Sequence, residues 1–183
     1  MQSDDRPLGE MFTQDTVSCF DKYLPRIVRC LELLSEKEIW WRPNAASNAA
    51  GNVVLHVCGN VRQWIISGLG GAADMRERDK EFAERGPVSR RQLIAQLKST
   101  VAEARKIIAG LSTEALSREY LIQGYRVSGL VAVAHVFEHF SYHTGQIIYL
   151  TKLKSAKDLR FTRLPGVKPA PKRPAAARAD GRP

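Results

Sequence analysis

The four histidines are the residues of this chain whose type and spacing could do chemistry. His135, His139 and His143 follow one another at intervals of four in the segment AHVFEHFSYHTGQI, and His56 stands far upstream. Residues four apart lie on one face of a helix, about 5–6 Å apart at Cβ, so two imidazoles can point at one ion and leave its far side open. A third ligand must come from a facing helix, and His56 is the histidine available to supply it.

Two other interpretations of these histidines were weighed. A single histidine among apolar residues is usually a hydrogen-bonded structural residue, but three in series without partners would together cost about several kcal/mol, which favours metal. The segment from His135 to His139 also fits H-x-x-E-H, the inverted zinc-protease pattern, with Glu138 as general base. That pattern requires a downstream carboxylate ligand. After Glu138 the sequence has no glutamate, and its only aspartates are Asp158 and Asp180, so the protease interpretation is weak.

Four segments with helical periodicity would have to position these histidines, and none of the chain alternates convincingly as a strand does. The first covers about residues 9–34, where Pro25 predicts a kink or a break. The second, capped by Ser47 or Asn48, carries His56 and ends at a cluster of glycines. The third follows a capping box at Ser89, and the fourth covers about residues 128–153. A further capping box at residues 35–38 predicts a short helical turn, and residues 120–127 could be extended.

The segments connecting these helices are long for a bundle. Four helices of roughly 20 residues fit an antiparallel-type bundle, but connections of about 12–20 residues indicate that one or more crosses between non-adjacent helices. The connection at residues 74–86 holds five acidic and four basic residues. Arg76, Arg78 and Arg85 could hold an anionic cosubstrate there, but the mixed charge favours a solvated loop.

Composition limits the class of protein. A chain of 183 residues with 44% hydrophobic content suits one domain with a tail. The longest uncharged stretch, residues 43–61, contains four asparagines and His56, so it predicts no bilayer span. The N-terminal sequence lacks the apolar core of a signal peptide. Three cysteines (Cys19, Cys30 and Cys58) are too few for a disulfide scaffold, so we expect a reducing cytoplasm and buried thiols.

The net charge of +9 is concentrated at the C-terminus. Residues 152–183 hold ten Lys/Arg and two Asp, and the rest of the chain is nearly neutral. From residue 165 onward the composition is rich in Pro, Ala, Lys, Arg and Gly, which predicts a disordered basic tail. Such a tail can bind nucleic acid weakly through counterion release. A solubilising extension is the interpretation that we favour.

Several of these motifs together resemble the DinB/YfiT-like superfamily of four-helix metal proteins. The similarity lies in residues 139–147 (HFSYHTGQI), in residues 51–60 (GNVVLHVCGN) followed by Trp64, and in residues 41–44 (WRPN). It spans roughly residues 11–161, including the segment at 158–161 (DLRF), and leaves out the tail.

The resemblance implies an all-α four-helix bundle over residues 8–163, with the disordered basic tail at 164–183. It implies a divalent ion on three histidines, which by position are His56, His139 and His143. His135 would then line the pocket or orient a ligand, and a role as fourth ligand stays open. Relatives include S-transferases and isomerases that depend on low-molecular-weight thiols, but many members have no known activity. The resemblance also implies a homodimer.

Three neutral histidines would leave the ion its full charge and an open position, which is typical of a catalytic site. We expect zinc first, with nickel, iron and manganese as alternatives, because imidazole selects weakly among them. Gln146 and Asn60 return to the histidine faces and could donate outer hydrogen bonds or simply join two helices. Glu138 is rotated about 100° from His139 and could face a neighbouring helix instead of the pocket.

Three functions remain open from the sequence. The first is a metal-dependent enzyme that activates a thiol or water for attack on a small electrophilic substrate, as an S-transferase or hydrolase would. The second is a metal-binding or dimerisation module without turnover. The third is nucleic-acid association through the tail alone.

Overall fold

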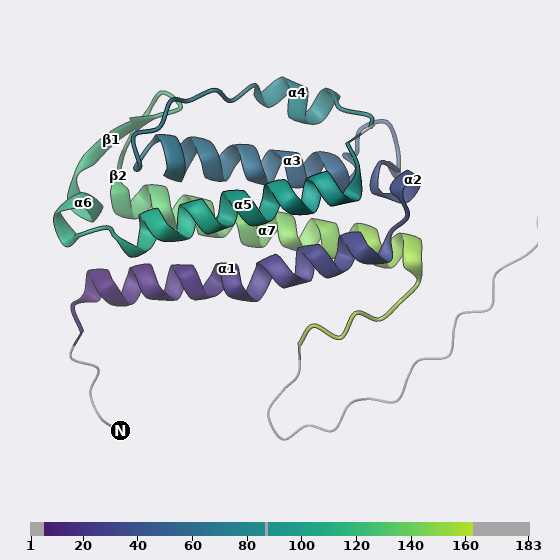
Figure 1. Cartoon of the computed structure of the whole chain (residues 1–183), viewed down its shortest axis with the longest axis horizontal. Coiled ribbons are helices and arrows are strands. Elements are labelled where there is room, and N and C mark those ends of the chain that lie inside the picture. The colour runs from purple at the N-terminus through teal and green to yellow at the C-terminus, as the bar shows by residue number, and fades with distance from the viewer. Residues whose placement is uncertain (1–5, 87, 163–183) are drawn as a thin grey trace, which may run out of the picture.

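The computed structural model describes residues 6–86 and 88–162 and shows a four-helix bundle (Figure 1). Its long helices are α1 (Leu8–Leu33), α3 (Ala50–Val61), α5 (Arg90–Ala109) and α7 (Gly129–Ser155), and α3 continues as one π-helical segment, η1 (Arg62–Ser67). Shorter elements connect them: α2 (Glu36–Ile39), α4 (Arg78–Ala83), α6 (Thr113–Ser117) and a hairpin of β1 (Glu119–Ile122) with β2 (Tyr125–Ser128). The predicted all-α class is confirmed. The predicted tail at 164–183 lies outside the described residues.

The four long helices occupy the corners of a square. Both α1 and α3 pack against α5 and α7, so α1 and α3 lie at opposite corners. In Figure 1, α1 and α7 run in one direction, and α3 and α5 run in the other. Two of the four neighbouring pairs are therefore parallel, which departs from the predicted antiparallel type. Parallel neighbours require the chain to return along the bundle, and the connection carrying α4 does so above α3 (Figure 1).

The starts of the helices follow local side-chain chemistry. Ser35 and Ser89 form the two predicted capping boxes, with Glu38 and Gln92 respectively. The predicted cap of α3 is wrong: the helix follows Ala49, not Ser47 or Asn48. Asn52, the third residue of the helix, reaches back and accepts the backbone N–H of Ala49 at 3.2 Å, which is the reciprocal half of a capping box, while Ala49 itself has no side chain that could cap the helix.

The structure also tests the expectations for Pro25 and for residues 120–127. α1 runs through Pro25 without a break, because Ile27, Leu31 and other residues on both sides of the proline are buried in the core and hold the helix together. The segment that could be extended forms the hairpin, whose turn places Gln123 and Gly124 at φ 53° and 82°. Two successive positive φ angles are typical of a tight hairpin turn.

The core lies between the four long helices and is largely aliphatic. The rings of Phe20 on α1 and Phe140 on α7 meet edge to face, with centroids 5.0 Å apart. This packing fixes α7 against α1, and an adjoining face of α7 packs directly against its other neighbour, α3. Among residues 6–86 and 88–162, no helix combines the length and apolar character needed to cross a bilayer.

Candidate metal centre

Three histidines from two neighbouring helices meet in the bundle. His56 lies on α3, and His139 and His143 lie one turn apart on α7. The Nε2 atom of His139 is 3.0 Å from Nε2 of His56 and 3.2 Å from Nε2 of His143. Each histidine can offer one ring nitrogen to a common ion, and these nitrogens all lie within 4.8 Å of one another. The structure therefore brings together the three residues predicted as metal ligands.

Hydrogen bonds at the far side of two rings determine which nitrogen carries the proton. Nδ1 of His56 is 2.9 Å from Oε2 of Glu81, and Nδ1 of His143 is 2.7 Å from Oε1 of Gln146. A carboxylate oxygen and an amide oxygen are acceptors only, so each assigns the proton to Nδ1. Nη2 of Arg76 also lies 3.2 Å from Nδ1 of His56, but it donates to the nearer Glu81 oxygen at 3.0 Å, which leaves this assignment intact. In a neutral imidazole the other nitrogen, Nε2, then carries a lone pair. Both of these lone pairs are directed towards His139.

The arrangement of the Nε2 atoms fits a bound cation. If Nε2 of His139 carries a proton, it can donate that proton to Nε2 of His56 or to Nε2 of His143, but not well to both. The other close contact then has two lone pairs facing each other, which is unfavourable. A positive ion between the rings would satisfy all three acceptors at once. Nitrogen ligands at the usual zinc distance in tetrahedral geometry lie about 3.3 Å apart, close to the two separations from Nε2 of His139. The donor set present therefore fits a divalent transition metal.

Burial keeps the α7 histidines neutral, as ligation requires. Burial, with the nearby charges of His143, His56, His135 and Arg76, lowers the pKa of His139 to about 3. Burial also lowers the pKa of His143, although the hydrogen bond to Gln146 opposes this shift. Neutral rings with free lone pairs are the form that binds a metal ion.

A carboxylate from the crossing connection orients His56. Glu81, on α4, accepts hydrogen bonds from Nδ1 of His56 at 2.9 Å and from Nη2 of Arg76 at 3.0 Å through the same oxygen. Its other oxygen accepts from Nε of Arg76 at 2.8 Å. Burial raises the pKa of Glu81, but the hydrogen bonds from His56 and Arg76 lower it further, so the net direction is down. A carboxylate behind a histidine fixes the ring orientation and raises its basicity as a ligand.

Gly59 makes room for this carboxylate. It lies on α3 nearly one turn after His56, and a Cβ atom added there would overlap the Glu81 carboxylate. The same Cβ would be 2.9 Å from Nε of Arg76, closer than real Cβ contacts allow. The absence of a side chain at this position therefore allows the Glu81–Arg76 pair to lie directly against α3.

The sequence names Arg76 only as a possible contact for an anionic cosubstrate, and it does not single out Glu81. The connection was interpreted as a solvated loop, but the side chains of Arg76 and Glu81 are only 5% and 11% exposed. Arg76 also donates to Oε1 of Gln63 at 2.9 Å. Mixed charges are equally typical of surface loops, so the charge pattern alone could not reveal this buried pair. The glycine inside α3 was the one local signal that something approaches the helix closely.

His135, one turn before His139, contacts the site from the side. Its Nε2 is 3.2 Å from Nδ2 of Asn60, and its ring lies against Trp64 with centroids 4.1 Å apart. Burial lowers its pKa. Oδ1 of Asn60 and Nε1 of Trp64 are buried without a hydrogen-bond partner in the described part of the chain. The structure thus joins His135 to Asn60, and the three-histidine cluster does not include it.

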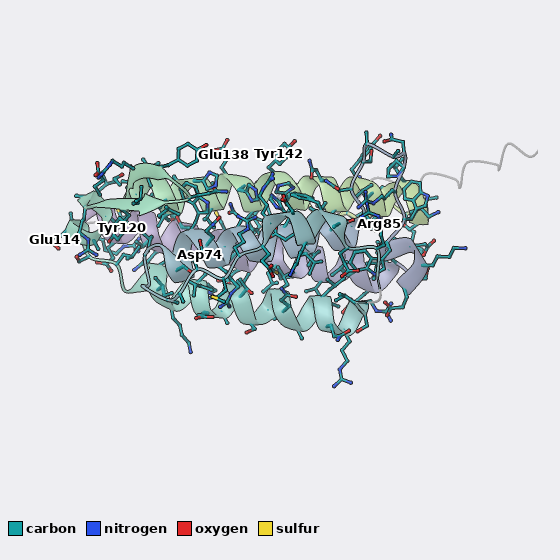
Figure 2. The ribbon with its side chains drawn as sticks, turned by 90° about the horizontal axis from the view of Figure 1, so that it is seen from above. Asp74, Arg85, Glu114, Tyr120, Glu138 and Tyr142 are labelled. Atoms are coloured by element: carbon teal, nitrogen blue, oxygen red, sulfur yellow. The ribbon has the colours of Figure 1, made fainter. Side chains whose placement is uncertain are left out.

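The other two sequence candidates lie on different sides of α7. Gln146 contacts His143, as described above. Glu138 is exposed, and Figure 2 shows it projecting outward from α7 together with Tyr142. Within residues 6–86 and 88–162 no hydrogen bond joins Glu138 to a histidine, and its charge opposes the lowering of the pKa of His135, which lies outside the three-histidine cluster.

The cysteines contribute no ligand to the cluster of described residues. Cys30 and Cys58 are buried, and Cys19 is partly exposed. Burial raises the pKa of Cys58 to about 12. A thiol with such a pKa stays protonated at neutral pH and is neither a nucleophile nor a ready ligand.

Comparisons with known proteins agree with this fold. Residues 8–167 match a protein-family model described as "Protein of unknown function (DUF1572)". No curated protein matches the chain. A conserved protein from Enterococcus faecalis has a similar structure, with 17% identity and a TM-score of 0.69 over 79% of this chain and 98% of that chain.

Two DinB-like proteins of known structure are similar as well. The DinB-like protein YjoA from Bacillus subtilis is 20% identical, with a TM-score of 0.61 over 79% of this chain and 95% of that chain. A DinB-like protein from Bacillus cereus is 14% identical, with a TM-score of 0.62 over 76% and 91%. At such identities the likeness shows a common fold.

Proposed function

The chain belongs to the DUF1572 family, a DinB-like family described as having unknown function, and from the geometry of its histidine cluster we propose that it is a metal-dependent enzyme. Its ligands are His56, His139 and His143, and the ion that we propose is zinc. The observation that carries the proposal is the convergence of three Nε2 atoms with too few protons to satisfy one another.

The charges around the cluster support a catalytic site more than a closed structural one. Three neutral imidazoles leave the positive charge of an ion intact, and a fourth position is free for a small molecule. A divalent ion in such a site supplies Lewis acidity, which lowers the pKa of a water or a thiol towards neutrality.

The surrounding residues hold the cluster in one geometry and leave one side accessible. Glu81 fixes the ring of His56, and Gln146 fixes the ring of His143. His56 is only 6% exposed, whereas His139 and His143 are partly exposed. A small molecule would therefore approach from the side of the two α7 histidines.

We propose that the reaction is attack by a thiol or a water on a small electrophilic substrate, as in S-transferases and hydrolases. A thiol and a water are both compatible with a neutral three-histidine site. The nucleophile would come from outside the protein, because no buried cysteine of the described chain provides one. A low-molecular-weight thiol is the co-substrate that we propose to test first.

Elemental mass spectrometry of the untagged full-length protein tests the first step. We expect about one transition metal per chain, and no stoichiometric metal in a His139→Ala/His143→Ala variant. A His135→Ala variant is the matched control, because it removes a neighbouring imidazole without removing a proposed ligand. Activity screens for thiol transfer and hydrolysis then use the metal that was found.

The outcomes separate metal binding from catalysis. Protein that contains no metal and takes up none from zinc, nickel or manganese would overturn the proposal. Stoichiometric metal without turnover in either screen would favour a binding module over an enzyme.

A further inference from the structure

A second polar site lies in the described part of the chain, at the end of the bundle that carries α2. It is a cleft of about 780 Å³ between α2, the residues that follow α4, and the last turn of α7. Its basic lining residues are Lys37, Arg42, Arg85 and Lys154, and Trp40 and Trp41 form much of the rest. It contains none of the proposed metal ligands.

The cleft carries an excess of positive charge. Against four basic side chains it has one carboxylate, that of Glu38, and this group already accepts hydrogen bonds from the backbone and hydroxyl of Ser35. None of the four basic groups forms an ion pair with a carboxylate of residues 6–86 or 88–162. The ammonium of Lys154 lies 4.6 Å from the centre of the Trp41 ring instead.

Arg42 is the most unusual of these groups. Its Nη2 donates to Oδ1 of Asn52 and to the carbonyl of Phe82, both at 2.9 Å, so its partners are neutral. Its Nε is buried and has no hydrogen-bond partner in the described structure. Burial and the charge of Arg85 lower the pKa of Arg42. A partly buried guanidinium beside a second one is unfavourable unless an anion compensates both.

Arg85 is held so that part of its guanidinium faces outward. Its Nη1 donates to three carbonyls at the end of α4, those of Phe82, Ala83 and Glu84, at 2.7–3.0 Å. No hydrogen bond from its Nε or Nη2 is made to the described residues. Figure 2 shows Arg85 at this end of the bundle, away from Glu138 and Tyr142. Guanidinium edges of this kind bind carboxylate and phosphate in a bidentate manner.

We propose that this cleft binds a small molecule through an oxyanion, either a phosphate or a carboxylate group. Arg42 and Arg85 contact the anion, and Lys37 and Lys154 add favourable charge. The inference is independent of the proposed metal chemistry, because no metal ligand lines the cleft. The two sites are linked most directly through α4, where Phe82 contacts Arg42 through its carbonyl and His56 through its ring, with centroids 4.6 Å apart.

Calorimetric titration of the full-length protein tests this site. The probes are inorganic phosphate and malonate, with sodium chloride at matched ionic strength as the reference, and the protein is first freed of metal with a chelator that is then removed by dialysis. We expect saturable binding of at least one oxyanion, weakened at least tenfold in Arg85→Gln. Binding of phosphate alone or of malonate alone identifies the group and supports the proposal.

Two further variants keep the test decisive. Arg85→Gln also removes the hydrogen bonds from Arg85 to the end of α4. The double variant Lys37→Gln/Lys154→Gln leaves those hydrogen bonds intact, and we expect it to bind the oxyanion at least threefold more weakly. Lys106→Gln, an exposed position on α5, is the matched control for charge. No saturable binding, or equal effects of the control and the cleft variants, would overturn the proposal. Loss of binding in His139→Ala with none in Arg85→Gln would place the anion at the histidines and also overturn it.

Discussion

Nδ1 of His56 donates a hydrogen bond to Glu81 at 2.9 Å, although the two residues are 25 positions apart in the chain. The contact depends on the topology of the bundle. Because α3 and α5 are parallel neighbours, the chain between them returns along α3 and brings α4 over the histidine (Figure 1). The crossing connection therefore supplies the hydrogen-bond partner of a cluster histidine that lies on the preceding helix.

The first prediction concerns this outer partner. Glu81→Gln keeps the shape of the side chain but removes the negative charge that polarises His56. Loss of such a partner typically weakens metal affinity about 10–100-fold. We expect a decrease in this range for zinc, measured by competition with a chromophoric chelator, and little change in helical content by circular dichroism.

Glu77→Gln is the control for this experiment. Glu77 lies on the same connection but is 65% exposed and pairs with Lys80 at the surface. Surface pairs of this kind contribute little, so its zinc affinity should equal that of the unmodified protein. Equal affinity in Glu81→Gln would instead show that the carboxylate does not support the metal site.

The second prediction concerns stability with and without metal. A ligand that binds only the folded state, at 100 times its dissociation constant, stabilises it by about 2.7 kcal/mol. For a domain of this size we expect the midpoint of thermal unfolding to rise by roughly 5–10 °C. The His139→Ala/His143→Ala variant should show no rise. The same rise in that variant would mean that the ion binds elsewhere on the protein.

The histidine cluster was predictable from the sequence because the spacing of its members follows helical geometry. An interval of four residues places His139 and His143 on one face of a helix, whatever the rest of the fold. His56 is the only histidine on another predicted helix, so it was the natural third member of the cluster. The capping boxes at Ser35 and Ser89 were predictable for the same reason, since each involves residues within one turn.

Longer-range features were not predictable in the same way. Apolar periodicity shows which face of a helix is buried but does not specify the direction of its neighbour, so the parallel pairs of helices were missed. The cap of α3 was misplaced because the helix begins after Ala49, which has no capping side chain, and the contact at its start comes from Asn52 inside the helix instead of from Ser47 or Asn48. The burial of Arg76 depends on a partner that only the crossing connection brings into place.

The third prediction concerns the thiols. A pKa raised to about 12 means that Cys58 forms almost no thiolate at pH 8, and burial also raises the pKa of Cys30. Burial raises the pKa of Cys19 too, but Cys19 is partly exposed whereas the other two thiols are buried. Iodoacetamide should therefore modify native protein at Cys19 alone, and all three cysteines after unfolding in guanidinium. Mass spectrometry of the intact protein counts the adducts. Rapid native labelling of Cys58 would contradict the packing of α3 against α5.

The last prediction concerns Gly59. Alanine there should strengthen the helix by up to about 1 kcal/mol on propensity alone, but its Cβ would overlap the Glu81 carboxylate and displace it from His56. We therefore expect Gly59→Ala to weaken zinc binding about tenfold or more, in the same range as loss of the carboxylate itself.

Gly145→Ala is the matched control for Gly59→Ala, because Gly145 lies on α7 between His143 and Gln146 and a Cβ there meets nothing within 4 Å. It should leave zinc affinity unchanged and raise thermal stability slightly. If Gly59→Ala bound zinc as tightly as Gly145→Ala, the close approach of Glu81 to α3 would not matter for the metal. Combining Gly59→Ala with Glu81→Gln sharpens the test, because two substitutions that act through one contact should weaken binding no more than the stronger of them does alone.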